Sequence, residues 1–172
     1  SLLTNTTGSN NTAMGRTSLV YNTEGESNTA IGATSITNNT TGSNNTGIGY
    51  NVLGANTTGG SNTAIGYNAG NTLTTGSNNT FLGNNANAGA NNLSNATALG
   101  NGAVVAASNT IQLGNTSVTN VKTSGTVTAG AVTYPRTDGT NGQVLTTNAS
   151  GVASWTTPAV GGFTHYLGEA FN

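Results

Sequence analysis

The repeat is plainest in residues 27–66, which read SNTAIGATSITNNTTGSNNTGIGYNVLGANTTGGSNTAIG. The motif SNTAIG at 27–32 returns as NNTGIG at 44–49 and again as SNTAIG at 61–66, so each copy begins seventeen positions after the last. Outward from this stretch, the glycine that closes the motif keeps the same spacing at Gly15, Gly32, Gly49, Gly66, Gly83 and Gly100. The next step, from Gly100 to Gly114, is three positions shorter.

Two apolar columns run through the repeat. The first directly precedes the glycines, and we predict that it forms the core ladder of the fold: Met14, Ile31, Ile48, Ile65, Leu82, Leu99 and Leu113. A charge in this column, as in Ile48→Asp, is then expected to unravel the fold. The second column consists of Leu2, Leu19, Ile36 and Leu53, lapses at Gly70 and Asn87, and resumes at Val104.

A period this short predicts an all-β fold, a β-solenoid or β-roll over residues 1–116. Helical-pair repeats need roughly 30 residues or more. Thr, Val and Ile favour strands, whereas Gly and Asn tolerate the positive φ of tight corners. The glycine column from Gly15 to Gly100 is therefore predicted to form the coil corners. Stacked coils would place identical Thr and Asn side chains in hydrogen-bonded ladders.

Charge is nearly absent from this sequence. Only 4% of the residues are charged, with a net charge of −1. The charged residues are Arg16, Glu24, Glu26, Lys122, Arg136, Asp138 and Glu169. We therefore expect no nucleic-acid partner, because such binding needs clustered Lys and Arg. We also expect no membrane span, because no apolar run approaches the ~20 residues required.

The thin predicted core favours self-association. Each coil supplies only a few apolar side chains, many of them Ala, and a small unit of this kind buries little surface. We predict a parallel homotrimer along the rod axis, with head-to-tail polymerisation as a further form of self-association. A monomeric solenoid held together by ladders between coils is the alternative.

The units SNTAIG at 27–32 and SNTAIGYNA at 61–69 resemble the head repeats of trimeric autotransporter adhesins. That resemblance implies a left-handed parallel β-roll in a homotrimer on a cell surface. The shorter closing step, from Gly100 to Gly114, matches the spacing of that family better than the longer steps do. The Asn-, Thr- and Gly-rich repeats also resemble segments of phage-type and other long surface fibres.

The repeat ends before Val118, and residues 117–160 are predicted to form a β-rich neck or hairpin connector. Period-two patterns predict strands at 118–121 and 126–134, and a hairpin of 143–147 with 152–157. The passage GQVLTT at 142–147 with WTTP at 155–158 resembles a tail-fibre connector. Residues 161–172 are interpreted as the start of a truncated further domain or as a docking tail.

Catalytic chemistry has little support in the sequence. Residues 27–121 contain no Asp, Glu, His, Lys or Arg, so a nucleophilic Ser or Thr there has no base beside it. His165 with Glu169 is interpreted as structural or solvent-facing. The sequence has no Cys and one His, so we expect no metal site and no cofactor. Asn-Xaa-Thr triplets are expected from the composition, which makes glycosylation a minor hypothesis.

The sequence thus predicts a non-catalytic, extracellular or cell-surface structural fibre: the rigid shaft or spacer of an adhesin, a filament or a tail fibre. The alternative is a ligand-binding solenoid that uses Thr, Asn and Tyr ladders for carbohydrate or ice. Tyr50 and Tyr67, at one coil position, are the candidate ligand face, with a surface glycan or receptor as partner.

Overall fold

A computed structural model describes residues 1–124, 140, 143–147 and 153–158. Contacts divide the chain into two units, Ser1–Lys122 and Thr123–Asn172. The described residues contain eleven strands and no helix. The first unit is a parallel β-solenoid, as the repeat predicted.

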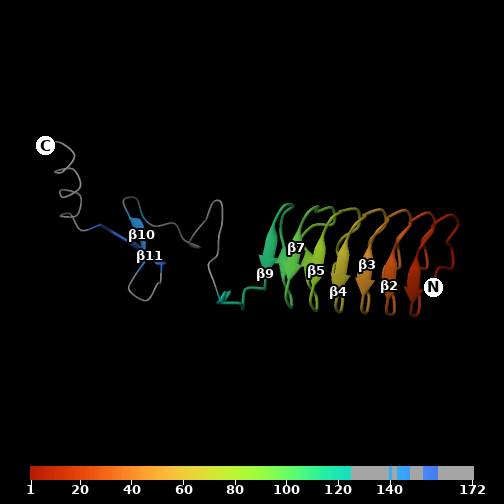
Figure 1. Ribbon diagram of the computed structural model, residues 1–172, viewed down its shortest axis with the longest axis horizontal. Helices are drawn as coiled ribbons and strands as arrows, with labels where there is room; N and C mark the ends of the chain where they lie inside the picture. Colours follow the sequence, from red (N-terminus) through yellow and green to blue (C-terminus); the bar gives the residue numbers. More distant parts are fainter. Residues whose placement is uncertain (125–139, 141–142, 148–152, 159–172) are drawn as a thin grey trace, which may run out of the picture. The chain divides into compact units, whose positions relative to one another are not determined.

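One face of the solenoid is a seven-stranded parallel sheet in the order β1-β2-β3-β4-β5-β7-β9 (Figure 1). The strands are short because each coil must turn again after three residues. They are β1 Thr12–Met14, β2 Thr29–Ile31, β3 Thr46–Ile48, β4 Thr63–Ile65, β5 Thr80–Leu82, β7 Thr97–Leu99 and β9 Ile111–Leu113. Equivalent residues pair across every step, so Thr29 faces Thr46 and Ile31 faces Ile48.

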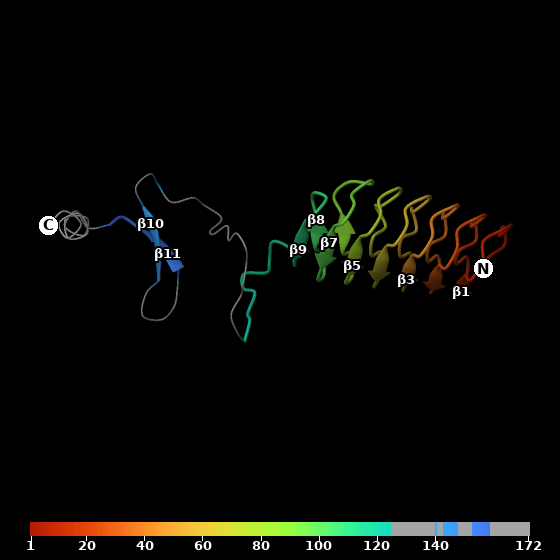
Figure 2. The ribbon, with the colours of Figure 1, turned by 45° about the horizontal axis from the view of Figure 1, so that its top comes forward.

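A second, two-stranded parallel sheet forms only in the last coils, from β6 Asn87–Ala88 and β8 Val104–Val105 (Figure 2). Elsewhere this side of the coil is built from turns. Left-handed residues recur there at one coil position, with φ of 48° at Leu19, 48° at Ile36 and 49° at Leu53. These three side chains, which belong to the second apolar column, are completely buried. In the last coil the buried residue is Val105, whereas Val104 is half exposed.

The predicted core ladder does not lie in the core. Successive residues of a strand point to opposite faces, and the interior takes the middle residue of each strand, as at Ala30, Ala64 and Ala98, which are fully buried. The flanking aliphatic column lies on the outer face. Its side chains are half-buried at Ile31 and otherwise exposed, from 37% at Ile48 to 64% at Met14. The prediction is therefore wrong for the single chain: the coil is too thin for any side chain but Ala at most of these interior positions. The displaced column is Met14, Ile31, Ile48, Ile65, Leu82, Leu99 and Leu113.

The corner glycines follow the strands directly. Their φ values lie between 117° at Gly100 and 141° at Gly66, a region that L-residues rarely adopt. Backbones of adjacent coils also approach closely here, and a Cβ on Gly49 would collide with the carbonyl oxygen of Gly66. Both constraints explain why the column Gly15, Gly32, Gly49, Gly66, Gly83 and Gly100 has no other residue type.

Two buried Asn columns complete the interior. In one, each side-chain amide donates to the Asn of the preceding coil: Asn22 Nδ2 to Asn5 Oδ1 at 2.7 Å, Asn39 to Asn22 at 2.7 Å, and Asn56 to Asn39 at 2.9 Å. In the other, the Oδ1 of Asn28 accepts from the backbone N–H of Asn45 at 2.9 Å. These ladders satisfy buried polar groups that would otherwise destabilise the coil.

The apolar part of the core is rearranged at one coil. Phe81 stands where the other coils have Ala or Gly, apart from Gln112 in the last coil, and it is completely buried. Gly70 stands where earlier coils have Leu or Ile, and a Cβ there would lie 2.8 Å from Phe81 Cδ2. The Phe81 ring thus occupies space that a branched side chain at 70 would need, and this explains the lapse in the second column.

In the second unit, β10 Val144–Thr147 and β11 Ala153–Thr156 form an antiparallel pair, which confirms the predicted hairpin. Leu145 pairs with Trp155. The predicted strand at 118–121 is wrong: these residues form no strand and are exposed. The predicted strand at 126–134, the His165 interpretation and the tail at 161–172 lie outside the described residues.

Candidate functional site

The outward face of the seven-stranded sheet carries two parallel columns of side chains. In each strand the first residue and the third lie on this face, because they are two residues apart. The third residues are the aliphatic column described above. Except in β9, which begins with Ile111, the first residues form a Thr column, which we call the strand-Thr column: Thr12, Thr29, Thr46, Thr63, Thr80 and Thr97. The sheet therefore presents an uncharged surface of alternating hydroxyl and aliphatic rows.

The two Thr columns of the coil differ in their hydrogen bonding. In the turns, the hydroxyls of Thr6, Thr23, Thr40, Thr57 and Thr74 donate to backbone carbonyls of the next coil at 2.8–3.2 Å. The hydroxyls of the strand-Thr column make no hydrogen bond within the described part of the chain. Of these two columns, only the strand-Thr column has hydroxyl groups that donate no hydrogen bond to the described part of the chain.

A second candidate surface follows the sheet at the coil corners. Tyr50 and Tyr67 stack with their ring centroids 5.3 Å apart and their planes 10° from parallel. Each is 48% exposed. The structure thus brings together the two residues of the predicted ligand face. Ala33 precedes them in the column and Asn84 follows them.

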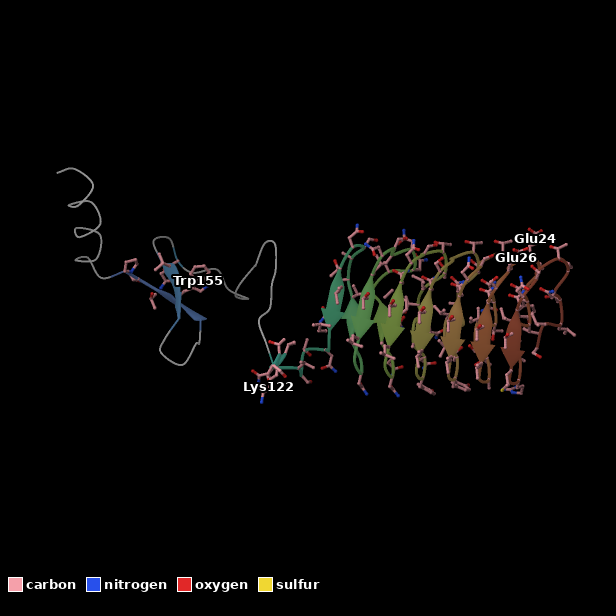
Figure 3. All side chains as sticks on the ribbon, in the orientation of Figure 1. Glu24, Glu26, Lys122 and Trp155 are labelled. Atoms are coloured by element: carbon pink, nitrogen blue, oxygen red, sulfur yellow. The ribbon has the colours of Figure 1, made fainter. Side chains whose placement is uncertain are left out.

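Acidic side chains lie away from these faces, whereas Arg16 lies in the same column as the Tyr pair. Figure 3 shows Glu24 and Glu26 beside the starts of the strands, whereas the Tyr pair follows the strand ends. Within the described ranges no ion pair forms, and no group of three or more His, Asp or Glu residues could hold a metal ion. Lys122 lies beyond β9 and is exposed.

No protein-family model, curated protein or solved structure matches this chain. The described part of the chain has no helix with the length and hydropathy of a membrane span. The function must therefore be argued from the two faces themselves.

Sequence reasoning placed the aliphatic column in the core and so missed that it shares a face with the strand-Thr column. The motif Thr-Ala-Ile contained the necessary signal. Its first and third residues must lie on one face, and a hydroxyl at the first position is disfavoured in a dry core. Phe81 was also missed, although it replaces a small residue in the coil that follows the lapse at Gly70.

Proposed function

We propose that this chain is a non-catalytic structural rod that assembles with two identical copies, in parallel, through the outward face of the seven-stranded sheet. The observation that carries the proposal is the continuous column of outward-facing aliphatic side chains, which reaches from Met14 to Leu113. Contiguous exposed apolar surface is characteristic of protein–protein interfaces.

A second copy fits this face better than an unrelated partner does. Every coil has the same strand spacing of about 4.8 Å, so two copies match rung for rung over the whole sheet. Residues 27–121 carry no charged side chain, so identical copies do not repel one another. The interior is built mainly of Ala and Asn, and burial of the outward column would add the apolar surface that the single coil lacks.

The size of the face favours a closed trimer over a dimer. Seven strands of three residues give a projected area of roughly 30 Å by 10 Å. A standard interface buries about 800 Å² per partner, so one such contact is weak. In a cyclic trimer every copy contacts two neighbours around a common axis, so the aliphatic columns of three sheets are enclosed in one core rather than those of two. Such a rod serves as the shaft or spacer of an extracellular adhesin, filament or tail fibre.

Solution mass and electron microscopy of the full chain test this proposal. Wild-type protein is expected at three chain masses and as short rods or filaments. Ile48→Asp is expected to give monomers with unchanged strand content, because Ile48 lies outside the coil; this replaces the expectation of unravelling. Thr41→Asp places the same charge on an exposed turn and is expected to remain trimeric. A monomeric wild type would refute the proposal.

The strand-Thr column favours a second candidate, a binding module for ordered water or ice. Its free hydroxyls repeat at about 4.8 Å on a sheet that no charge interrupts. In this case the face must stay open, so the protein would be monomeric and would show thermal hysteresis. Thermal hysteresis that is abolished by Thr63→Asp would favour this function over trimer formation.

A further inference from the structure

The Tyr50–Tyr67 stack has two outer faces, and neither has an aromatic neighbour, because Ala33 precedes Tyr50 in the column and Asn84 follows Tyr67. Adjacent coils hold the column in register, since Asn68 N–H donates to the Tyr50 carbonyl at 2.9 Å and Asn51 N–H donates to the Ala33 carbonyl at 3.0 Å. Tyr67 covers one side of the Tyr50 ring. On the other side the neighbouring rung carries only the methyl group of Ala33, which is too small to cover a ring. We call the surface over Ala33 the slot.

The far side of this slot carries a positive charge. Arg16 occupies the same column two rungs from Tyr50, a separation of about 10 Å at the usual strand spacing. Its side chain is exposed, and among the described residues its guanidinium has no ion-pair partner. A ring placed over Ala33 would therefore stack on Tyr50, and a charged substituent at the ring edge would lie on the side of the Arg16 guanidinium.

Two further features make the slot suited to an anion. The turns directly after β1, β2 and β3, residues 15–21, 32–38 and 49–55, contain no Asp or Glu, and Glu24 and Glu26 lie beside the starts of the strands (Figure 3). At the other end of the stack, Tyr67 is followed by Asn84, whose Oδ1 accepts from Asn85 Nδ2 at 2.6 Å. That end offers an amide pair but no charge, so the two ends differ chemically.

We propose that this slot, defined by Arg16, Ala33 and Tyr50, binds a sugar ring that carries a carboxylate, such as a uronic acid unit of an acidic polysaccharide. The C–H face of the ring stacks on Tyr50 over Ala33. The carboxylate accepts two hydrogen bonds from the guanidinium, the geometry that Arg offers best. The site lies on the corner of a single chain and does not rest on the proposed assembly.

Titration of a galacturonic acid oligomer into the full chain, followed by NMR shifts of the Tyr ring protons, tests the site. We expect saturable shifts, and none with a neutral galactose oligomer of the same length. Arg16→Gln is expected to weaken binding about tenfold or more, since it removes a charged hydrogen-bond pair.

Two matched variants separate this slot from a general effect of the Tyr ladder. Ala33→Tyr extends the ladder into the slot and is expected to abolish binding while the rod stays folded. Asn84→Tyr extends the ladder at its other end and is expected to leave binding unchanged. The proposal is overturned if Ala33→Tyr binds like wild type, if both variants lose binding equally, or if the acidic oligomer gives no shifts. Solution mass of each variant shows separately whether assembly is intact.

Discussion

Gly70 and Phe81 form one packing unit, and a double-mutant cycle on this pair tests how the core is built. Phe81 is fully buried, and a Cβ on Gly70 would lie 2.8 Å from both Phe81 Cδ2 and Leu53 Cδ2. In the preceding coil the two equivalent positions are occupied by Leu53 and Ala64, which are both fully buried. The exchange Gly70→Leu with Phe81→Ala would therefore copy a core that the molecule already contains.

Each single change is expected to be costly. Phe81→Ala removes a buried ring and leaves a cavity, which costs about 3–5 kcal/mol. Gly70→Leu forces a side chain against the ring and costs about 1–3 kcal/mol or more. The backbone does not oppose Leu at 70, where φ is 65°, because Leu53 adopts 49° at the equivalent position.

The double variant is expected to recover most of this loss. It buries about two carbons fewer than wild type, which costs about 1–2 kcal/mol at about 0.8 kcal/mol per methylene. The single losses add to about 4–8 kcal/mol, so the coupling energy is expected to exceed about 2 kcal/mol.

The assay is denaturant unfolding monitored by circular dichroism, at one fixed protein concentration because assembly would add a concentration-dependent term. Phe81→Ala combined with Thr41→Ala provides the control, and these distant changes should add within about 0.5 kcal/mol. If Gly70→Leu and Phe81→Ala were equally additive, the two residues would not share a packing site and the account of the core would fail.

The ladders, the corners and the charge distribution each give a further prediction. Asn39→Ala breaks the buried ladder and should destabilise the rod by about 1–3 kcal/mol, whereas Thr41→Ala should change stability by less than about 0.5 kcal/mol in the same unfolding assay. Gly49→Ala should prevent formation of the soluble rod, because the added Cβ collides with the backbone carbonyl oxygen of Gly66. Gly60→Ser gives this position the residue found in the neighbouring coils, and it should raise the unfolding free energy by about 0.4–1 kcal/mol. The unfolding free energy of the rod should be nearly independent of pH from about pH 5 to 9. Residues 27–121 carry no carboxylate, amine or imidazole, so folding there changes no proton binding. A melting temperature that changes with pH in this range would contradict this.

The period alone was enough to predict the solenoid. A short repeat with a fixed Gly, a Thr-Xaa-aliphatic motif and a polar turn is consistent with one coil geometry. Each strand from β2 to β5 consists of the three residues of the Thr-Xaa-aliphatic motif. The hairpin of β10 and β11 was equally readable, because its two period-two runs flank a short turn sequence. In both cases the relevant interactions are local or strictly periodic.

Which residues of each strand point into the coil and which point outward was harder to predict. In Thr-Ala-Ile, the usual preference for burial places Ile inside, whereas the structure places Ala30 inside and leaves Ile31 on the outer face. The reason is the width of the coil, which sequence periodicity does not report. Phe81 lies inside only because Gly70 makes room for it, so its burial depends on a contact between residues that occupy different positions of the repeat.

The buried Asn columns explain how a chain with so little apolar surface specifies a single register. An Asn amide that lies one coil position out of register would lose both its donor and its acceptor, and each unpaired buried group costs about 1–3 kcal/mol. The column that contains Asn22, Asn39 and Asn56 ends at Asn56, because Leu73 occupies the next position. The Oδ1 of Asn56 is therefore buried without a hydrogen-bond partner. Hydrophobic packing then takes over, with Leu73 and Leu93 in one apolar cluster with Phe81. In this column hydrogen bonds therefore give way to apolar packing, whereas the second Asn column continues to Asn79, whose Oδ1 accepts from the Ala96 N–H at 2.9 Å. Both kinds of contact leave the aliphatic column of the sheet free for contacts between chains.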